Sequence, residues 1–309
     1  MTKVFLYCDE SGAKGYANQD ETYPGEVGVF AGIMIPEECI ATVKSTFDQL
    51  AARYMPTSGK LHIADLLTEQ QGRIRNELFA EIRRTKFPCF WYAIHVAGLH
   101  AHHSAQTALL KRSAEEFHLA RGGNDPRIKR GSSREEPASM HVELFSGLYS
   151  HLVAFLVERG QEGVDVEIQT DHVDTPIMKR FKEVASDLLN NDPRVSTPTG
   201  FDTVEKKVVG GSVTCSVQWP PELDFSPVVK SLSIGTVPQS DGLVLAADVL
   251  ANSLNHLFKI RGPGTLYTPL NCRDAVANHP LAEYLNAFRS WGSGDLIGDR
   301  IYQHPKAGA

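Results

Sequence analysis

The apolar residues of this chain fall into two alternating patterns, short continuous runs and longer stretches with helical spacing. The continuous runs are rich in β-branched and aromatic residues and stop at glycine, proline or acidic residues, which is typical of buried strands. They cover residues 3–8, 27–35, 87–96 and 164–170, with shorter β-like runs at 207–209 and 228–234. Helical spacing is found at about 36–50, 68–84, 104–119, 142–159, 176–189, 241–258 and 281–289.

Strands and helices that alternate in this way predict one α/β domain, built on a mixed β-sheet flanked by helices. We place this domain at residues 1–260 and treat 261–309 as a C-terminal extension packed on it. Residues 97–141 interrupt the alternation with inserted helical and loop segments, and we expect this insertion to be mobile. Thr68 and Gln71 match a capping box at the start of the second helix.

Composition and charge narrow the classes of function. With 309 residues, 42% hydrophobic and 22% charged, the chain has an ordinary globular composition and can bury a sizeable core. A net charge of -6 disfavours a protein that holds duplex DNA through general electrostatics alone. The same charge is compatible with an enzyme that collects several acids around a cation.

The cysteines and the hydropathy indicate a location. The five cysteines are scattered and form no Cys-x-x-Cys, which favours reduced thiols over a disulfide framework or a zinc knuckle. No apolar run approaches the roughly 18 residues needed to span a bilayer, and the N-terminus does not show the pattern of a signal peptide. We therefore expect a soluble, cytoplasmic protein with no membrane partner.

Acidic residues follow two of the predicted strands. The first strand ends in Asp9-Glu10-Ser11, and the fourth ends one residue before Asp171. Ligands tend to bind at the carboxyl ends of strands in α/β sheets, so these residues form a candidate site. They also have a structural alternative, because aspartate and serine commonly hydrogen-bond the turn after a strand and an aspartate can cap the following helix. Either explanation fits each group taken alone.

The predicted helix at 241–258 supplies a third group of acids. Asp241 and Asp248 lie along one face of it, and Asp248 interrupts an otherwise apolar stretch near its middle. A carboxylate at such a position is costly to bury unless it is paired or bound to a cation. A solvated helix face is the alternative explanation. The three groups together favour a shared site.

Carboxylates that converge from separate elements suit one kind of chemistry. Hard divalent ions such as Mg²⁺ and Mn²⁺ take oxygen ligands. Two such ions roughly 4 Å apart activate water and stabilise the leaving oxygen in phosphodiester cleavage. Ligands from one short segment cannot surround two ions, so acids from several elements are needed. We therefore predict that Asp9, Glu10, Asp171 and Asp248 bind Mg²⁺ or Mn²⁺.

A resemblance to a known family rests on the order of these motifs. The strand ending Tyr-Cys-Asp-Glu-Ser-Gly, the segment Leu61-His62-Ile63-Ala64-Asp65-Leu66, the strand ending at Asp171 and the segment 241–248 follow one another along residues 3–258. This arrangement resembles the DUF3800 family of mostly bacterial proteins, which implies an RNase H-like fold. It also implies a metal-dependent nuclease site with Asp9, Asp171 and Asp248 as ligands and Glu10 as a further or supporting group.

The resemblance also bears on accessory residues and partners. In this context the resemblance implies that His62 approaches the metal site or orients the water; the alternative is a structural histidine at the start of a helical turn. Asp65, Asp241 and Ser11 are further accessory candidates. The implied substrate is a nucleic acid, either RNA or DNA, and cleavage of two strands would favour a homodimer. The alternative is a catalytically inactive RNase H-like module that binds nucleic acid or protein in a defence or toxin system. In a further alternative, the acids only cap turns.

Overall fold

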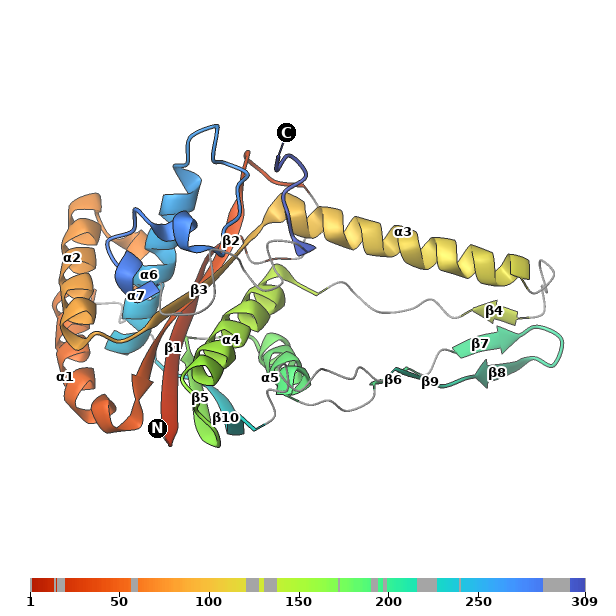
Figure 1. The fold of residues 1–309 in the computed structure, drawn as a ribbon, viewed down its shortest axis with the longest axis horizontal. Coiled ribbons are helices and arrows are strands. Elements are labelled where there is room, and N and C mark those ends of the chain that lie inside the picture. The colour runs from red at the N-terminus through yellow and green to blue at the C-terminus, as the bar shows by residue number, and fades with distance from the viewer. Residues whose placement is uncertain are drawn as a thin grey trace.

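The computed structural model describes most of the chain, and Figure 1 shows its arrangement. The described residues are 2–13, 15, 20–56, 61–120, 128–130, 138–171, 173–189, 194–196, 199–215, 227–238, 240–285 and 301–308. One sheet with helices on both faces forms the body of the molecule. A long helix and several short strands extend from it to one side.

The central sheet has five strands in the order β10-β5-β1-β2-β3. The first three strands in sequence form an antiparallel meander, and β5 and β10 run parallel to β1. This mixed sheet flanked by helices confirms the predicted α/β class and is consistent with an RNase H-like fold. The strands are β1 Lys3–Gly12, β2 Val27–Pro36, β3 Cys89–His95, β5 Val164–Thr170 and β10 Val229–Thr236.

Two layers of helices bury the two faces of the sheet. Helices α1, α2 and α6 cover one face, and α4 and α5 cover the other. All five follow the predicted helical spacing, because their apolar residues repeat on the side that meets the sheet. Their bounds are α1 Glu37–Tyr54, α2 Thr68–Thr85, α4 Met140–Glu158, α5 Thr175–Leu189 and α6 Gly242–Lys259.

Helix α4 has the length and apolar composition of a membrane span, although no membrane segment was expected. In the described part of the chain it is the one helix with this property. However, 72% of its apolar window is buried inside the fold, where it packs against β2, β3 and α5. A core helix of a soluble protein has the same composition, so the burial agrees with the expectation of solubility.

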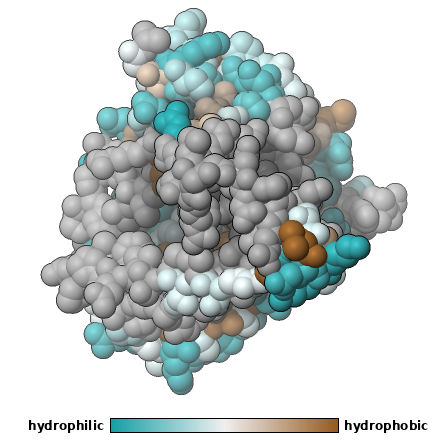
Figure 2. Space-filling view, turned by 90° about the vertical axis from the view of Figure 1, so that its right-hand side faces the viewer, coloured by the Kyte–Doolittle hydropathy of each residue, from teal (hydrophilic) through white to brown (hydrophobic). Residues whose placement is uncertain are grey.

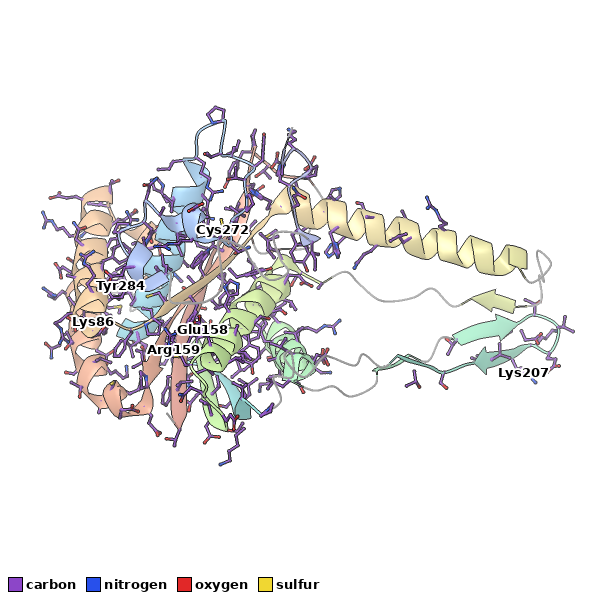
Figure 3. The ribbon with its side chains drawn as sticks, viewed as in Figure 1. Lys86, Glu158, Arg159, Lys207, Cys272 and Tyr284 are labelled. Atoms are coloured by element: carbon purple, nitrogen blue, oxygen red, sulfur yellow. The ribbon has the colours of Figure 1, made fainter. Side chains whose placement is uncertain are left out.

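The insertion after β3 is more regular than the sequence indicated. Helix α3, Val96–Ala120, begins directly at the end of β3, and β4, Ile128–Arg130, pairs with a hairpin much later in the chain. The glycine- and serine-rich residues 121–127 and 131–137 lie outside the described residues. The hairpin carries Lys207 at the far side of the molecule (Figure 3). Its elements are β7 Thr199–Asp202 and β8 Lys207–Gly210, and a separate pair is β6 Arg194–Ser196 with β9 Val213–Cys215.

The described residues on the side of this insertion are mostly polar where they can be seen (Figure 2). Figure 2 faces that side and shows hydrophilic residues over most of the described surface, with single hydrophobic ones between them. The exposed hydrophobic residues of the hairpin are Phe201, Val204 and Val208.

The described residues after α6 add to the core of the sheet. Leu270, Val276, Leu281 and Leu285 join the same apolar cluster as α1, α2 and α6. Tyr284 lies beside α2, where its hydroxyl donates to the Arg83 carbonyl at 3.3 Å (Figure 3). The elements here are a 3-10 turn, η3 Arg273–Val276, and α7, Ala282–Leu285. The rest of the helix predicted at 281–289 lies outside the described residues.

The predicted capping box is wrong by one position. Helix α2 begins at Thr68, but its N-cap is Leu67, and the Leu67 N–H donates to the Gln70 side chain at 3.1 Å. The Gln71 side chain instead donates to the Leu66 carbonyl at 2.8 Å. The preceding chain enters the helix in an extended conformation, which moves the cap one residue before the hydroxyl that the sequence suggested.

Replacing two helical glycines, Gly242 and Gly72, by alanine is expected to have opposite effects on stability. A Cβ on Gly242 would lie 2.2 Å from the backbone of Phe47, where α6 meets α1, whereas a Cβ on Gly72 meets nothing within 4 Å. We expect Gly242→Ala to lower the free energy of unfolding by about 1–3 kcal/mol. Gly72→Ala should raise it by roughly 0.5–1 kcal/mol, because alanine loses less backbone entropy. Urea unfolding of both variants measures this, and equal shifts would contradict the close contact of α1 and α6.

Candidate metal centre

Near its C-terminal end, strand β1 carries two adjacent acids that face opposite sides of the sheet, because successive side chains on a strand alternate. Tyr7, two residues before Asp9, belongs to the core beneath α6, and Cys8 belongs to the core beneath α4. Asp9 therefore faces the α6 layer and is only 4% exposed. Glu10 faces the α4 layer, and its side chain is 9% exposed. Both acids are held at the edge where β1 leaves the core.

Asp171 completes a group of three carboxylates with these two. Strand β5 is the parallel neighbour of β1, so both strands release the chain at the same edge of the sheet. One carboxylate oxygen from each of Asp9, Glu10 and Asp171 lies within 4.8 Å of the other two. Oxygens on opposite sides of a magnesium ion are about 4.2 Å apart, since each Mg–O bond is about 2.1 Å. The spacing and the all-oxygen donor set therefore fit one hard cation.

Asp248 approaches the group from α6 but stands just outside it. Its Oδ2 accepts a hydrogen bond from the Ile63 N–H at 3.0 Å. Burial is the main cause that raises the pKa of Asp248 to about 6, with the Ile63 hydrogen bond and His62 opposing it and Asp171 and Glu10 adding to it. The carboxylate thus lies within electrostatic reach of the other acids, and its predicted part as a metal ligand stays a prediction.

The pKa of Asp9 is raised well above its usual value. Burial is the largest cause, followed by the charges of Glu10, Asp248 and Asp171. A hydrogen bond from the Glu10 N–H to Asp9 Oδ1 at 2.9 Å opposes the rise. The charges of neighbouring acids raise the pKa of both Asp9 and Asp248. Ionising all four carboxylates is therefore unfavourable, and a bound cation would relieve that repulsion.

His141 is a neighbour of this cluster that the sequence reasoning missed. Its Nε2 lies 3.5 Å from Glu10 Oε2. The imidazole is buried between the rings of Phe30 and Phe181, with ring centroids 5.6 Å and 5.0 Å away. The sequence feature that could have placed His141 is Ser139, the N-cap of α4, whose side chain accepts from the Val142 N–H. That cap places His141 in the first turn of the helix and fixes its direction.

Two accessory candidates, His62 and Asp65, lie on the loop before α2, and only His62 acts on the acid cluster. His62 precedes the 3-10 turn η1, Ile63–Asp65, and its charge acts on Asp248. Asp65 is exposed, and its N–H closes the turn by donating to the His62 carbonyl at 3.0 Å. His62 is thus placed beside the acids, and Asp65 serves the local turn.

The other two accessory candidates also differ in their surroundings. Asp241 is the N-cap of α6, where it accepts from the Leu243 and Val244 N–H groups and pairs with Lys44 at 2.7 Å. It lies two helical turns before Asp248. Its contacts are those of a residue that stabilises the start of α6. Ser11 shares the β1 face of Asp9, and its carbonyl accepts from the Asn255 amide at 3.5 Å.

A second polar pair, Ser253 with His279, has the residue types of a nucleophile and a base but the wrong proton arrangement. The Leu281 N–H donates to His279 Nδ1 at 3.0 Å, so the ring proton is on Nε2. That nitrogen donates to Ser253 Oγ at 2.8 Å, and the hydroxyl donates to the Leu250 carbonyl at 2.8 Å. Burial also lowers the pKa of His279 to about 4. The pair joins α6 to the C-terminal segment and does not activate the serine.

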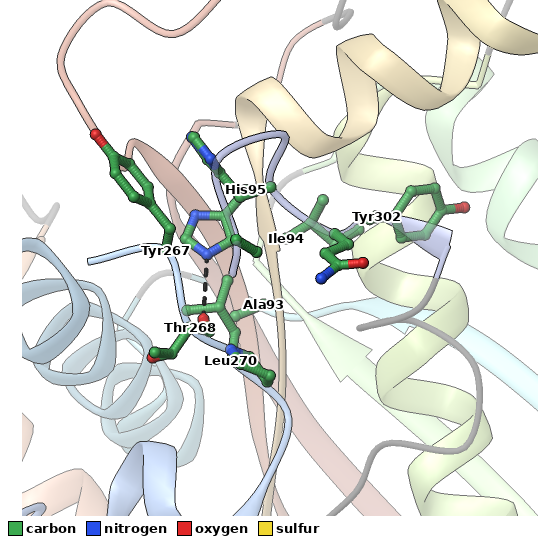
Figure 4. A pocket seen from close by; sticks show the side chains of 11 residues that line it. Ala93, Ile94, His95, Tyr267, Thr268, Leu270 and Tyr302 are labelled. Atoms are coloured by element: carbon green, nitrogen blue, oxygen red, sulfur yellow. Dashed lines mark hydrogen bonds between the residues drawn. The ribbon is translucent and has the colours of Figure 1, made fainter. Parts of the chain in front are cut away.

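A small pocket near the end of β3 lies apart from the acids (Figure 4). His95 Nε2 donates to the Thr268 carbonyl at 3.4 Å, and burial lowers the pKa of His95 to about 4. The Tyr267 ring stacks on His304, with centroids 4.1 Å apart, and His304 pairs with Glu21 at 3.2 Å. These contacts hold residues 301–308 against the body of the protein, so the pocket is a structural junction.

Comparison of the chain with protein-family models and with curated proteins gave no match.

Proposed function

We propose that this chain is a metal-dependent nuclease or related phosphodiesterase whose centre is formed by Asp9, Glu10, Asp171 and Asp248. The observation that carries the proposal is the meeting of three carboxylates within 4.8 Å at the ends of two parallel strands. Asp248 lies near them on α6, where the charges of Asp171 and Glu10 help to raise its pKa. The order of motifs that resembles the DUF3800 family supports the same assignment. The substrate would be RNA or DNA.

Each residue has a defined part in this proposal. A Mg²⁺ or Mn²⁺ ion held by the cluster would activate water and stabilise charge on the leaving oxygen. Asp9 and Asp171 supply oxygens from adjacent strands, and Asp248 is oriented by the Ile63 N–H. Glu10 supplies the third oxygen of the close group, with His141 beside it. Free thiols at Cys8, Cys39, Cys89 and Cys272 support a cytoplasmic location.

Metal titration followed by thermal melting tests the site itself. A ligand at a hundred times its Kd stabilises the folded protein by about 2.7 kcal/mol. For a chain of this size that corresponds to a rise in Tm of roughly 5 °C. We expect Mn²⁺ and Mg²⁺ to produce such a rise, and an unchanged Tm would contradict the metal centre.

Cleavage of labelled RNA and DNA strands in Mn²⁺ tests the activity. A metal-linked rise in Tm with cleavage of either substrate supports the nuclease. The same rise with no cleavage, but with retained binding of the strands, would favour the inactive binding module. Sedimentation of the protein alone measures whether it forms a homodimer.

A further inference from the structure

Arg75 of α2 is partly buried, and its charge has no acidic counterpart among the described residues. Its Nη2 donates to the Asn252 side-chain oxygen at 3.3 Å, and its Nε is enclosed by protein without a hydrogen-bond partner there. Burial lowers the pKa of Arg75, and no carboxylate contributes to that shift. A cation that is partly removed from water without an anion nearby is unfavourable. Arg75 is therefore expected to lower the stability of the free protein.

The other arginines of the same helix are exposed, and one of them, Arg83, donates to the Pro280 carbonyl at 3.4 Å. Arg73 pairs with Glu69, and Arg84 pairs with Glu81. Both arginines are largely exposed, where such pairs form readily and contribute little to stability. Arg75 differs in its partial burial and in its amide partner. An amide oxygen orients the guanidinium but does not neutralise it.

The position of Arg75 relates it to the acid cluster. Its partner Asn252 lies four residues after Asp248, on the same face of α6 and about 6 Å along the helix axis. One turn further on, the Asn255 amide donates to the Val27 carbonyl at 3.2 Å, at the β1–β2 end of the sheet. The polar face of α6 therefore runs from the metal centre past Arg75. Nearby His279 adds no second cation, because its pKa is low.

We infer that Arg75, oriented by Asn252, binds a phosphate group of the substrate strand next to the one that is cleaved. This inference rests on the proposed nuclease function and names the part of the substrate that is recognised. A guanidinium forms strong charge-assisted hydrogen bonds with phosphate oxygens. The contact is to the backbone, so it positions the strand beside the metal centre without reading its sequence.

Binding of fluorescent single-stranded RNA and DNA, measured without divalent metal over a range of salt, tests this contact. We expect Arg75→Gln to weaken binding roughly tenfold. The slope of log K against log salt should lose about 0.7, the value for one phosphate contact on a single strand. Arg75→Lys should keep the slope. The matched control is Arg73→Gln, which removes the same charge from the same helix and should change neither quantity.

Thermal melting separates phosphate binding from a structural part for Arg75. Because the cation has no acidic partner in the free protein, Arg75→Gln should leave its Tm unchanged or raise it. Inorganic phosphate should raise the Tm of the wild type and of Arg73→Gln more than that of Arg75→Gln. Arg75→Gln could lose the oligonucleotide contact while the wild type shows no response to inorganic phosphate. The site would then recognise phosphate only within a strand, which still supports the inference.

Two results would overturn the inference. The first is that the Arg75→Gln variant binds strands with the same affinity and the same salt slope as the wild type. This result would count even if the wild type cleaves the strands in Mn²⁺. The other is Arg75→Gln with a clearly lower Tm and unchanged binding, since the residue would then only support the fold. If the wild type shows no metal-dependent cleavage but Arg75→Gln still loses its response to phosphate, the nuclease proposal fails and the anion site stands.

Discussion

Asp9→Asn is expected to remove metal-dependent cleavage while it stabilises the metal-free protein. Asp9 is the most enclosed acid of the cluster, and its pKa is raised by burial and by three neighbouring carboxylates. The amide keeps the shape of the side chain and removes a charge that is unfavourable there. Changes to residues that only support metal ligands reduce affinity or activity by about 10–100-fold, so loss of a ligand should reduce cleavage at least about a hundredfold. Initial cleavage rates and Tm with and without Mn²⁺ measure both effects.

Asp241→Asn is the matched control for this variant. Asp241 is also a buried acid and loses the same charge, but it caps α6 and pairs with Lys44 away from the cluster. Asparagine is an equally good cap, so we expect a small loss of stability with the Mn²⁺ response and the cleavage intact. If Asp9→Asn kept the metal-linked rise in Tm, Asp9 would not be a ligand and the centre would have to be assigned differently.

The strands and helices of the core could be predicted because each carries its periodicity in its own sequence. Val164, Val166 and Ile168 alternate along β5 and enter one apolar cluster. The apolar residues of α6 repeat at helical spacing and leave Asp248 on the opposite face. A buried face forces such a pattern, so the meeting of β1, β5 and α6 at the acids could be anticipated as well.

Features that depend on distant partners could not be predicted in the same way. Strand β4 has three residues, and it forms because it pairs with β7 in a much later segment. His141 approaches Glu10 because α4 packs across β2 and β3, which no local pattern shows. The true cap of α2 depends on how the chain enters from η1. In these cases tertiary contacts decide the outcome, and local sequence signals do not contain them.

Two properties of the protein are expected to depend on pH with opposite signs. The stability of the metal-free protein should fall as pH rises, whereas the affinity for the metal ion should increase. Asp248 has a folded pKa of about 6, above its value in the unfolded chain, and the pKa of Asp9 is raised as well. Between the unfolded and folded pKa values the native state binds more protons than the unfolded state. The stability that Asp248 contributes to the metal-free protein is therefore lost as pH rises from about 4 to 6, and the contribution of Asp9 changes with the same sign.

Metal binding should follow the reverse course, because the carboxylates must lose their protons to bind the cation. Affinity for Mn²⁺ should rise about tenfold per pH unit for each proton released. The part of this rise that comes from Asp248 should level off above about pH 6. Calorimetric titration of Mn²⁺ from acidic to neutral pH measures the trend, and proton release can be read from its dependence on the buffer. Asp248→Asn should flatten the profile near pH 6. A flat profile in the wild type would mean that the ion binds without these acids.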